Sequence, residues 1–296
     1  MNSIDIESKK FLGQPKNFVS IFNALLFDGQ PVLKPEYLKD ENSELVMNVS
    51  SKHVDIIKRY EDGTYLDLFV IESQSYVDQC MVARVMEYES VARMRYIRQN
   101  FKKHVPMHTR LPMILTVVLY VGESKWNAAK RLSELEIIHP GFEDMFNEFK
   151  LNLIELNTNH KYNTGEKATQ DFFDLLRMIY RKQILKEDLD REFNRDALYF
   201  AYVVTKNKEL LNIYQESEKG DVKVCRALDE MFEESTNKGI QMGIKQGIEQ
   251  GVERGVKNTQ IKIAINMLVR NNQTLEEISE IVGLDLDALR ELKKSI

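Results

Sequence analysis

The sequence has few cysteines, no long apolar run and no excess of positive charge, and each scarcity excludes a class of protein. Its two cysteines, Cys80 and Cys225, lie far apart and form no C-x-x-C pair, which argues against a disulfide framework or a zinc site. The longest apolar stretch, Met113 to Val121, is shorter than the roughly 20 residues that a membrane helix needs. The first residues, MNSIDIESKKFLG, lack the apolar core of a secretory signal. We therefore expect a cytoplasmic protein without membrane contact.

Acidic residues slightly outnumber basic ones, 46 against 41, which gives a formal net charge of -5. This balance argues against avid, nonspecific DNA binding by the whole surface, although a local basic face is compatible with it. With 296 residues, 43% of them hydrophobic, the chain has an ordinary globular composition. It is long enough for a large core domain and an extension.

The first half of the chain alternates helix and strand patterns, which predicts an α/β fold with a central mixed β-sheet. Apolar residues at helical intervals predict a helix from Pro15 to Phe27, and Asp28-Gly29 ends it as a turn. Two strand patterns around Glu61-Asp62-Gly63 predict a β-hairpin. The elements expected from the hairpin onward are the strands Val54–Tyr60 and Thr64–Gln74, a helix from the N-cap Asp78 to about residue 100, the strand Leu111–Val121, the helix Phe142–Phe149 and the strand Lys150–Leu156.

Beyond about residue 165 the strand patterns stop, and we expect only helices. One stretch places a glycine at every fourth position, at Gly239, Gly243, Gly247, Gly251 and Gly255. On a helix these glycines form a slowly winding groove, and each costs about 1 kcal/mol of helix stability. Two interpretations remain open. The stretch is either one helix of a close-packed pair or a spacer between domains, in which the glycines are tolerated without a packing role.

The last segment, 258–296, carries short helix patterns. Thr274 to Glu277 forms a capping box, Gly283 breaks the chain, and Asp285 opens the last helix. Two interpretations remain here as well, a dimerising or docking helical hairpin and a helix-turn-helix that reads DNA. The patterns divide the chain into a core at 1–165, a helical region packing on the core at 166–238, a glycine-tetrad linker helix at 239–257 and a terminal helical hairpin at 258–296.

Carboxylates on the predicted hairpin are the first candidates for chemistry. If the turn is centred between residues 62 and 63, paired residues have numbers that sum to 125. Asp55 then lies opposite Val70, and His53 lies opposite Glu72. Asp55 and Glu72 become diagonal neighbours about 7–8 Å apart, a spacing at which two carboxylates can bridge a divalent cation. A turn with an odd number of residues would place them on opposite faces.

Gln74 shares the face of Glu72, because strand side chains alternate. A charge on this otherwise apolar strand is costly unless it is paired or binds a metal. A bound Mg²⁺ would activate water and neutralise phosphate charge in phosphodiester cleavage. From spacing alone two interpretations remain: a metal site, or edge-strand charges that face water or pair with an arginine. His53 is either a general base or a solvent-facing histidine.

The arrangement Asp55-(x16)-Glu72-x-Gln74 is similar to that of the Rpn family of recombination-promoting nucleases, also described as PD-(D/E)XK nuclease family putative transposases. NFVSIFNALLFDGQPVLKPEYL resembles the opening helix and turn of that family, and IESQSYVDQCMVARVMEYESVARMR resembles its E-x-Q strand and next helix. LPMILTVVLYVGESKW resembles the following strand and loop. With the glycine-tetrad helix and the terminal EEISEIVGL, these segments cover nearly the whole chain in the family's order.

The resemblance implies a restriction-endonuclease-like core with a central mixed β-sheet, followed by an all-helical C-terminal half. It implies a DNA endonuclease that depends on Mg²⁺, or on another divalent cation such as Mn²⁺, and serves recombination, transposition or defence against foreign DNA. Asp55, Glu72 and Gln74 would be the catalytic residues, with Asp55 and Glu72 as metal ligands. Gln74 takes the place of the superfamily's lysine, and a neutral glutamine would position water. Val54 stands where the superfamily has proline.

A local basic stretch follows the candidate strand and is opposed only by Glu87 and Glu89. Its candidate DNA-binding cations are Arg84, Arg93, Arg95, Arg98, Lys102 and Lys103, with His104 and Arg110 beyond them. These cations could position a duplex through its phosphates. They could equally be the solvated carboxyl end of a helix, where positive charge is favourable.

Two functions therefore compete at this stage. The first is a DNA endonuclease with its site on the hairpin. The second is a noncatalytic DNA- or protein-interaction module that retains the nuclease fold and works through its helical C-terminal half. The expected partners are DNA and, through the C-terminal helices, a second copy of the chain. A salt bridge in the candidate site, or carboxylates that point apart, would favour the second function.

Overall fold

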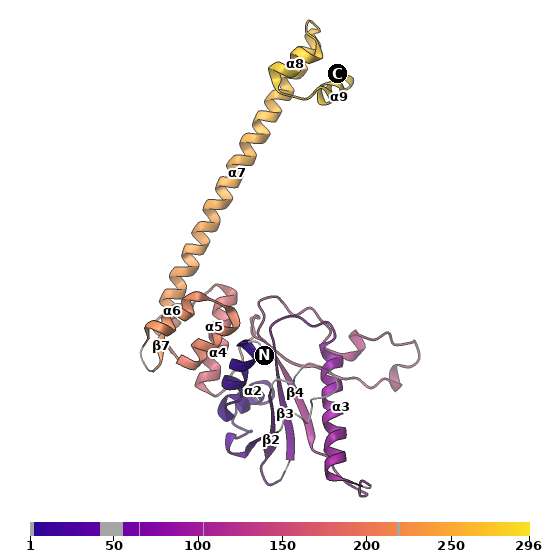
Figure 1. Cartoon of the computed structure of the whole chain (residues 1–296), viewed down its shortest axis with the longest axis vertical. Coiled ribbons are helices and arrows are strands. Elements are labelled where there is room, and N and C mark those ends of the chain that lie inside the picture. The colour runs from indigo at the N-terminus through magenta and orange to yellow at the C-terminus, as the bar shows by residue number, and fades with distance from the viewer. Residues whose placement is uncertain (1–2, 42–55, 65, 103, 218–219) are drawn as a thin grey trace. The chain divides into compact units, whose positions relative to one another are not determined.

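The computed structural model of the chain describes residues 3–41, 56–64, 66–102, 104–217 and 220–296. It divides into two compact units, Met1–Asp229 and Glu230–Ile296. The first unit contains a mixed five-stranded sheet with helices on both sides, and the second is helical (Figure 1). The expected α/β fold with a helical C-terminal region is therefore confirmed. Among the described helices, none is both long and apolar enough to span a membrane.

The sheet has the strand order β1-β2-β3-β4-β5, so β3 is its middle strand. Strands β1, β2 and β3 pair antiparallel, whereas β3, β4 and β5 pair parallel. Their bounds are β1 (Leu38–Asp40), β2 (Ile56–Glu61), β3 (Leu66–Gln74), β4 (Met113–Tyr120) and β5 (Asn152–Glu155). The predicted hairpin and the strands near 111–121 and 150–156 are thereby confirmed.

The register of the hairpin differs by two residues from the predicted one. Val70 pairs with Ile57, and Glu61 pairs with Leu66, so paired numbers sum to 127. The prediction that Asp55 lies opposite Val70 is therefore wrong. The register differs because the turn is longer than expected. The last pair before the turn is Glu61 with Leu66, with four residues between them, whereas a turn of two residues was predicted. Because strand side chains alternate with a period of two, a shift of two residues leaves each β3 side chain on the same face of the sheet.

Helices cover both faces of the sheet. Helices α2 (Pro15–Phe27) and α4 (Lys167–Arg181) lie on one side and α3 (Met81–Asn100) lies on the other (Figure 1). The rings of Phe22 and Phe69 pack 4.8 Å apart between α2 and β3. Helix α2 has the predicted bounds because Pro15 favours a helix start and Asp28, at φ 50°, ends it.

Two local predictions in this unit are wrong. Asp78 does not cap α3. It accepts a hydrogen bond from Cys80 N at 2.9 Å, and Cys80 is the N-cap. The segment Phe142–Phe149 forms only a single 3-10 turn at Glu143–Met145. Phe142 and Met145 are 55% and 76% exposed, so this short segment lacks the packed apolar face that stabilises most protein helices.

The region after residue 165 is mainly but not wholly helical. The expectation of helices alone is wrong, because β6 and β7 form a short antiparallel ladder. The remaining elements of this unit are α1 (Ser3–Leu12), α5 (Arg195–Thr205), α6 (Lys208–Glu216), β6 (Glu192–Phe193), β7 (Val222–Lys223) and the 3-10 turns Pro35–Tyr37, Leu132–Glu134 and Lys186–Asp188.

The second unit holds most of helix α7 (Cys225–Arg270), with α8 (Leu275–Val282) and α9 (Leu286–Lys294). The end of α7 and the two short helices share a small core formed by Ala264, Leu268, Ile278, Val282 and Leu289. The predicted capping box at Thr274 and the predicted N-cap at Asp285 are both present. Gly283 ends α8 at φ 72°, a left-handed conformation that suits glycine.

Candidate functional site

The candidate site lies at the carboxyl end of β3. Val70 of this strand points toward α3 and shares an apolar cluster with Tyr88. Because strand side chains alternate, Glu72 and Gln74 continue the same face. Both are buried, with exposed fractions of 4% and 5%. The strand therefore buries a carboxylate and an amide beneath α3, at a free-energy cost that partners or a ligand must offset.

Arg84 of α3 is the cation beside Glu72. Its Nη2 atom lies 3.4 Å from Glu72 Oε1 and donates to the Tyr88 hydroxyl at 2.6 Å. Its Nη1 atom forms an ion pair with Asp78, and its Nε atom donates to Tyr88 at 3.1 Å. Asp78 and Tyr88 thus hold the guanidinium from both sides, and Glu72 is the most distant of these oxygen partners.

The pKa shifts at this site follow from burial and from these hydrogen bonds. Burial opposes the charged form of Arg84, but the hydrogen bonds to Asp78 and Tyr88 outweigh it and raise the pKa of Arg84. Burial also raises the pKa of Tyr88, and the hydrogen bond from Arg84 only partly offsets this rise. At neutral pH the site therefore contains an arginine cation and an un-ionised tyrosine.

The side-chain nitrogen of Gln74 is buried and has no hydrogen-bond partner among the described residues. A buried donor without a partner costs about 1–3 kcal/mol. Such a group in a folded protein calls for a specific explanation, such as a ligand or an ordered water. The backbone carbonyl of Gln74 accepts from Val121 N at 2.9 Å, which fixes the end of the strand. Gln74 is thus held in place with an amide available for hydrogen bonding.

Asp55 and His53, predicted to lie across the hairpin from β3, fall outside the described residues. The first described pair of the hairpin is Ile56 with Ile71. The predicted metal-ligand role of Asp55 and the possible general base at His53 therefore stay predictions. The predicted pairing of His53 with Glu72 assumed paired numbers that sum to 125, which the described pairs of the hairpin do not follow.

The described donors fit part of a divalent-cation site. Glu72 offers a carboxylate and Gln74 an amide oxygen, both of which are hard oxygen ligands that Mg²⁺ accepts. Within the described part of the chain, no cluster of three or more histidine, cysteine, aspartate or glutamate side chains could hold a metal ion. A complete ligand set would therefore need Asp55, together with water or substrate oxygens.

Four of the predicted DNA-contacting cations, Arg84, Arg93, Arg95 and Arg98, lie on α3, and Arg84 contacts Glu72. The helix runs back along the sheet, so that Ala92 packs against Leu68 near the start of β3. At 1.5 Å per residue, Arg98 lies about 21 Å farther along the helix axis than Arg84. The exposed end of the basic stretch therefore lies toward the opposite end of β3 from Gln74.

The remaining cations of this stretch differ in their surroundings. Arg93 is half-buried and lies 4.0 Å from Glu89, a buried carboxylate on the same helix. Arg95 is half-buried, and Lys102 is exposed just beyond the helix end. Lys103 lies outside the described residues. Their contact with phosphate stays a prediction.

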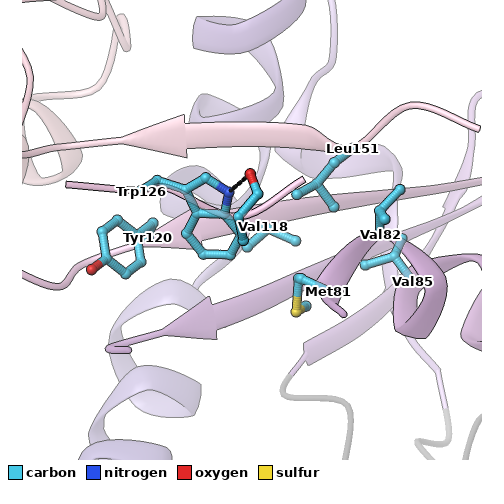
Figure 2. Packing of buried hydrophobic residues seen from close by; sticks show 8 residues of the cluster. Met81, Val82, Val85, Val118, Tyr120, Trp126 and Leu151 are labelled. Atoms are coloured by element: carbon cyan, nitrogen blue, oxygen red, sulfur yellow. Dashed lines mark hydrogen bonds between the residues drawn. The ribbon is translucent and has the colours of Figure 1, made fainter. Parts of the chain in front are cut away.

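The carboxyl edge of the sheet is braced by contacts that the sequence did not predict. Asn157 Nδ2 donates to the carbonyls of Gly122 and Ser124, at 3.1 and 2.6 Å. The rings of Tyr120 and Trp126 pack edge to face, 5.1 Å apart, within an apolar cluster beneath α3 (Figure 2). Nothing in the sequence marks Asn157, whereas the four-residue spacing of Arg84 and Tyr88 is a helical pair that could have been found.

The fold and the site define an α/β protein with a buried Glu-x-Gln pair at the carboxyl end of its middle strand. The family model described as "Putative transposase, YhgA-like" matches residues 36–210, which is more than half of the chain. The chain belongs to this family, and the resemblance to Rpn-type putative transposases is confirmed. No curated protein and no solved structure matches the chain. Membership supports a transposase-like or nuclease-like role in general and an interaction with DNA.

Proposed function

We propose that this protein is a metal-dependent DNA endonuclease of the PD-(D/E)XK type, which hydrolyses phosphodiester bonds. The observation that carries the proposal is the burial of Glu72 and Gln74, two residues apart on one face of β3, with the Gln74 amide nitrogen lacking a partner among the described residues. A carboxylate and an amide in this position provide a metal ligand and a group that can hydrogen-bond water.

Asp55 is the second carboxylate of the proposed site. The pairing of Ile56 with Ile71 would, if continued by one residue, bring position 55 opposite Glu72. Directly opposed residues in an antiparallel pair have Cβ atoms about 4.5–5.5 Å apart, which is closer than the diagonal arrangement predicted from the sequence. The observed register therefore supports Asp55 and Glu72 as joint ligands better than the predicted register did.

In the proposed reaction each residue has a separate task. A bound Mg²⁺ or Mn²⁺ would supply the charge that activates water and stabilises the phosphate oxygens. Asp55 and Glu72 would hold that cation, and Gln74 would orient the attacking water through its amide. Arg84 orients the Glu72 carboxylate from α3, held in turn by Asp78 and Tyr88. The water oxygen would form a bond to phosphorus and release a proton to solvent, while the bond from phosphorus to the leaving sugar oxygen breaks and that oxygen takes up a proton from solvent.

A second candidate function is a noncatalytic DNA- or protein-interaction module, and the ion pair between Arg84 and Glu72 is the observation that favours it. An arginine that neutralises Glu72 gives the carboxylate a structural partner without any metal. In this alternative the fold persists as a scaffold, and the helical C-terminal half makes the functional contacts.

Cleavage of supercoiled plasmid distinguishes the two candidates. Wild-type protein, Glu72→Gln and the matched control Glu87→Gln, on an exposed position of α3, would be assayed with Mg²⁺, with Mn²⁺ and with chelator. We expect nicking that needs the metal, falls more than about 100-fold in Glu72→Gln and is unchanged in Glu87→Gln. Folding of each variant would be checked by circular dichroism. Nicking that is equal in both variants, or absent from wild type with either metal, would favour the noncatalytic function.

We further propose that two copies of the chain associate through α7. Its isoleucines at positions 240, 244 and 248 are 55%, 58% and 61% exposed, a row of apolar side chains on one helix. The neighbouring glycines at 239, 243 and 247 have no atom within 4 Å of the position that a Cβ would take. A second helix could therefore approach closely along this face and cover the isoleucines.

A further inference from the structure

A basic cavity of about 250 Å³ lies at the end of α4. The loop after β5 contributes Asn159 and Lys161, and α4 contributes Arg177 and Arg181. Asp188 is the acidic residue of the lining, and it lies 3.6 Å from Arg191, which is outside the lining. The cavity was not suggested by the sequence, because its basic residues come from separate segments.

Hydrogen bonds connect this end of α4 to the candidate site. The hydroxyl of Tyr180 donates to the carbonyl of Val121, the residue directly after β4. The N–H of Val121 donates to the carbonyl of Gln74 at 2.9 Å. The cavity and the Glu72–Gln74 pair therefore lie at the same carboxyl edge of the parallel strands, the edge where ligands bind in open α/β sheets.

The charge of the cavity is positive and exposed. Arg177 is already paired with the buried Asp174 at 2.8 Å, so it adds hydrogen-bond donors rather than much net charge. Lys161 and Arg181 are exposed, and neither forms an ion pair with a described residue. Arg181 also donates to Gln183 at 3.3 Å, which limits its freedom before any ligand binds. Two exposed cations, Lys161 and Arg181, beside the guanidinium of Arg177 suit the oxygens of a phosphate group.

We propose that Lys161, Arg177 and Arg181 form a binding site for phosphodiester groups of DNA. The identity of the ligand rests on the proposed function, whereas the position of the site rests on the hydrogen bonds that join α4 to Val121 and Gln74. DNA held here would approach Glu72 at the carboxyl edge of the sheet. The exposed cations at the end of α3 lie toward the other end of β3, so they are less well placed to guide a strand to that carboxylate.

Binding measured without cleavage tests this inference. A fluorescein-labelled DNA duplex would be titrated with full-length protein in chelator, and its anisotropy recorded over a range of salt concentrations. The test variant is Lys161→Ala/Arg181→Ala, whose positions are exposed, and the matched control is Lys208→Ala/Lys223→Ala, exposed lysines outside the cavity. We expect the test variant to bind on the order of tenfold more weakly and to lower the salt slope by about 2. The control should bind as wild type does.

Several outcomes would overturn the inference. These are wild-type protein that does not bind the duplex, a test variant with unchanged affinity and salt slope, or an equal loss in the control. Inorganic phosphate that displaces the duplex at an equal phosphate concentration would assign the cavity to small anions instead of DNA. Binding that depends on Lys161 and Arg181 in a protein that never cuts would uphold the inference while the proposed nuclease function fails.

Discussion

Replacing Arg191 by methionine should destabilise the first unit far more than breaking an exposed ion pair. The guanidinium of Arg191 bridges two carboxylates of α4, with Nη2 at 2.6 Å from Asp171 and Nη1 at 2.8 Å from Asp174. The side chains of these aspartates are only 1% and 2% exposed. Methionine preserves most of the aliphatic stem, so the substitution mainly removes charge and hydrogen bonds.

The magnitude follows from burial. Removing one partner of a buried ion pair costs about 3–5 kcal/mol, because the other charge stays in the protein interior. We expect about 3 kcal/mol for Arg191→Met, since Lys167 still pairs with Asp171 at 2.7 Å and Arg177 with Asp174 at 2.8 Å. The matched control is Arg226→Met. That arginine lies 2.9 Å from Asp190, and the two side chains are 71% and 70% exposed, so solvent screens the pair and its loss should leave the urea midpoint nearly unchanged.

Urea unfolding followed by tryptophan fluorescence measures this difference. Trp126 is the single tryptophan, it is 7% exposed, and it lies in the first unit, so its emission reports the unfolding of that unit. A loss of about 3 kcal/mol should lower the urea midpoint by about 1 M or more. Equal midpoints for Arg191→Met and Arg226→Met would refute the argument that burial makes this pair strong.

Three further predictions concern other parts of the chain. Burial raises the pKa of Glu89, which accepts from Thr116 N at 2.9 Å, so wild-type stability should fall as pH rises above the ordinary carboxyl range. Glu89→Gln should therefore raise the urea midpoint at pH 7.5 but not near pH 4; a gain independent of pH would contradict this. In Gly122→Ala a Cβ would lie 2.6 Å from Ser75 O, so thermal unfolding should occur at lower temperature. By the proposed α7 contact, light scattering should show a dimer for wild type and a monomer for Ile244→Glu. A variant as dimeric as wild type would contradict the proposed α7 interface.

The local elements that the sequence predicted well have strong boundaries of their own. Helix α2 starts at Pro15, whose ring presets a helical φ, and ends at Phe27, because the C-cap Asp28 takes a left-handed conformation. Strand β4 was evident because it is apolar on both faces, as a strand covered on two sides must be. The segment Phe142–Phe149 has no side-chain cap, and Phe142 and Met145 are exposed, so its predicted helix is absent.

The candidate site was predictable only in part. Alternation along β3 placed Glu72 and Gln74 on one face whatever the register of the hairpin, because residues two apart on the same strand point to the same side. The pairing partner of Val70 was not predictable, since it depends on the length of the turn. The cavity at the end of α4 was also not predictable, because its lining joins α4 to the loop after β5, and only the folded protein brings these segments together.

Arg84 shows why charge in a sequence is a poor guide to what a charge does. Among the basic residues of its stretch it was a candidate for DNA contact, yet Asp78, Tyr88 and Glu72 surround its guanidinium. Its contacts to the Asp78 carboxylate and the Tyr88 hydroxyl are shorter than that to Glu72, so its position does not depend on Glu72. Because Asp78 and Tyr88 hold Arg84 in place, Arg84 can orient the Glu72 carboxylate without the two charges neutralising each other fully. This arrangement is compatible with a metal ligand at Glu72, and it shifts the proposed DNA contacts to Lys161 and Arg181, which are exposed.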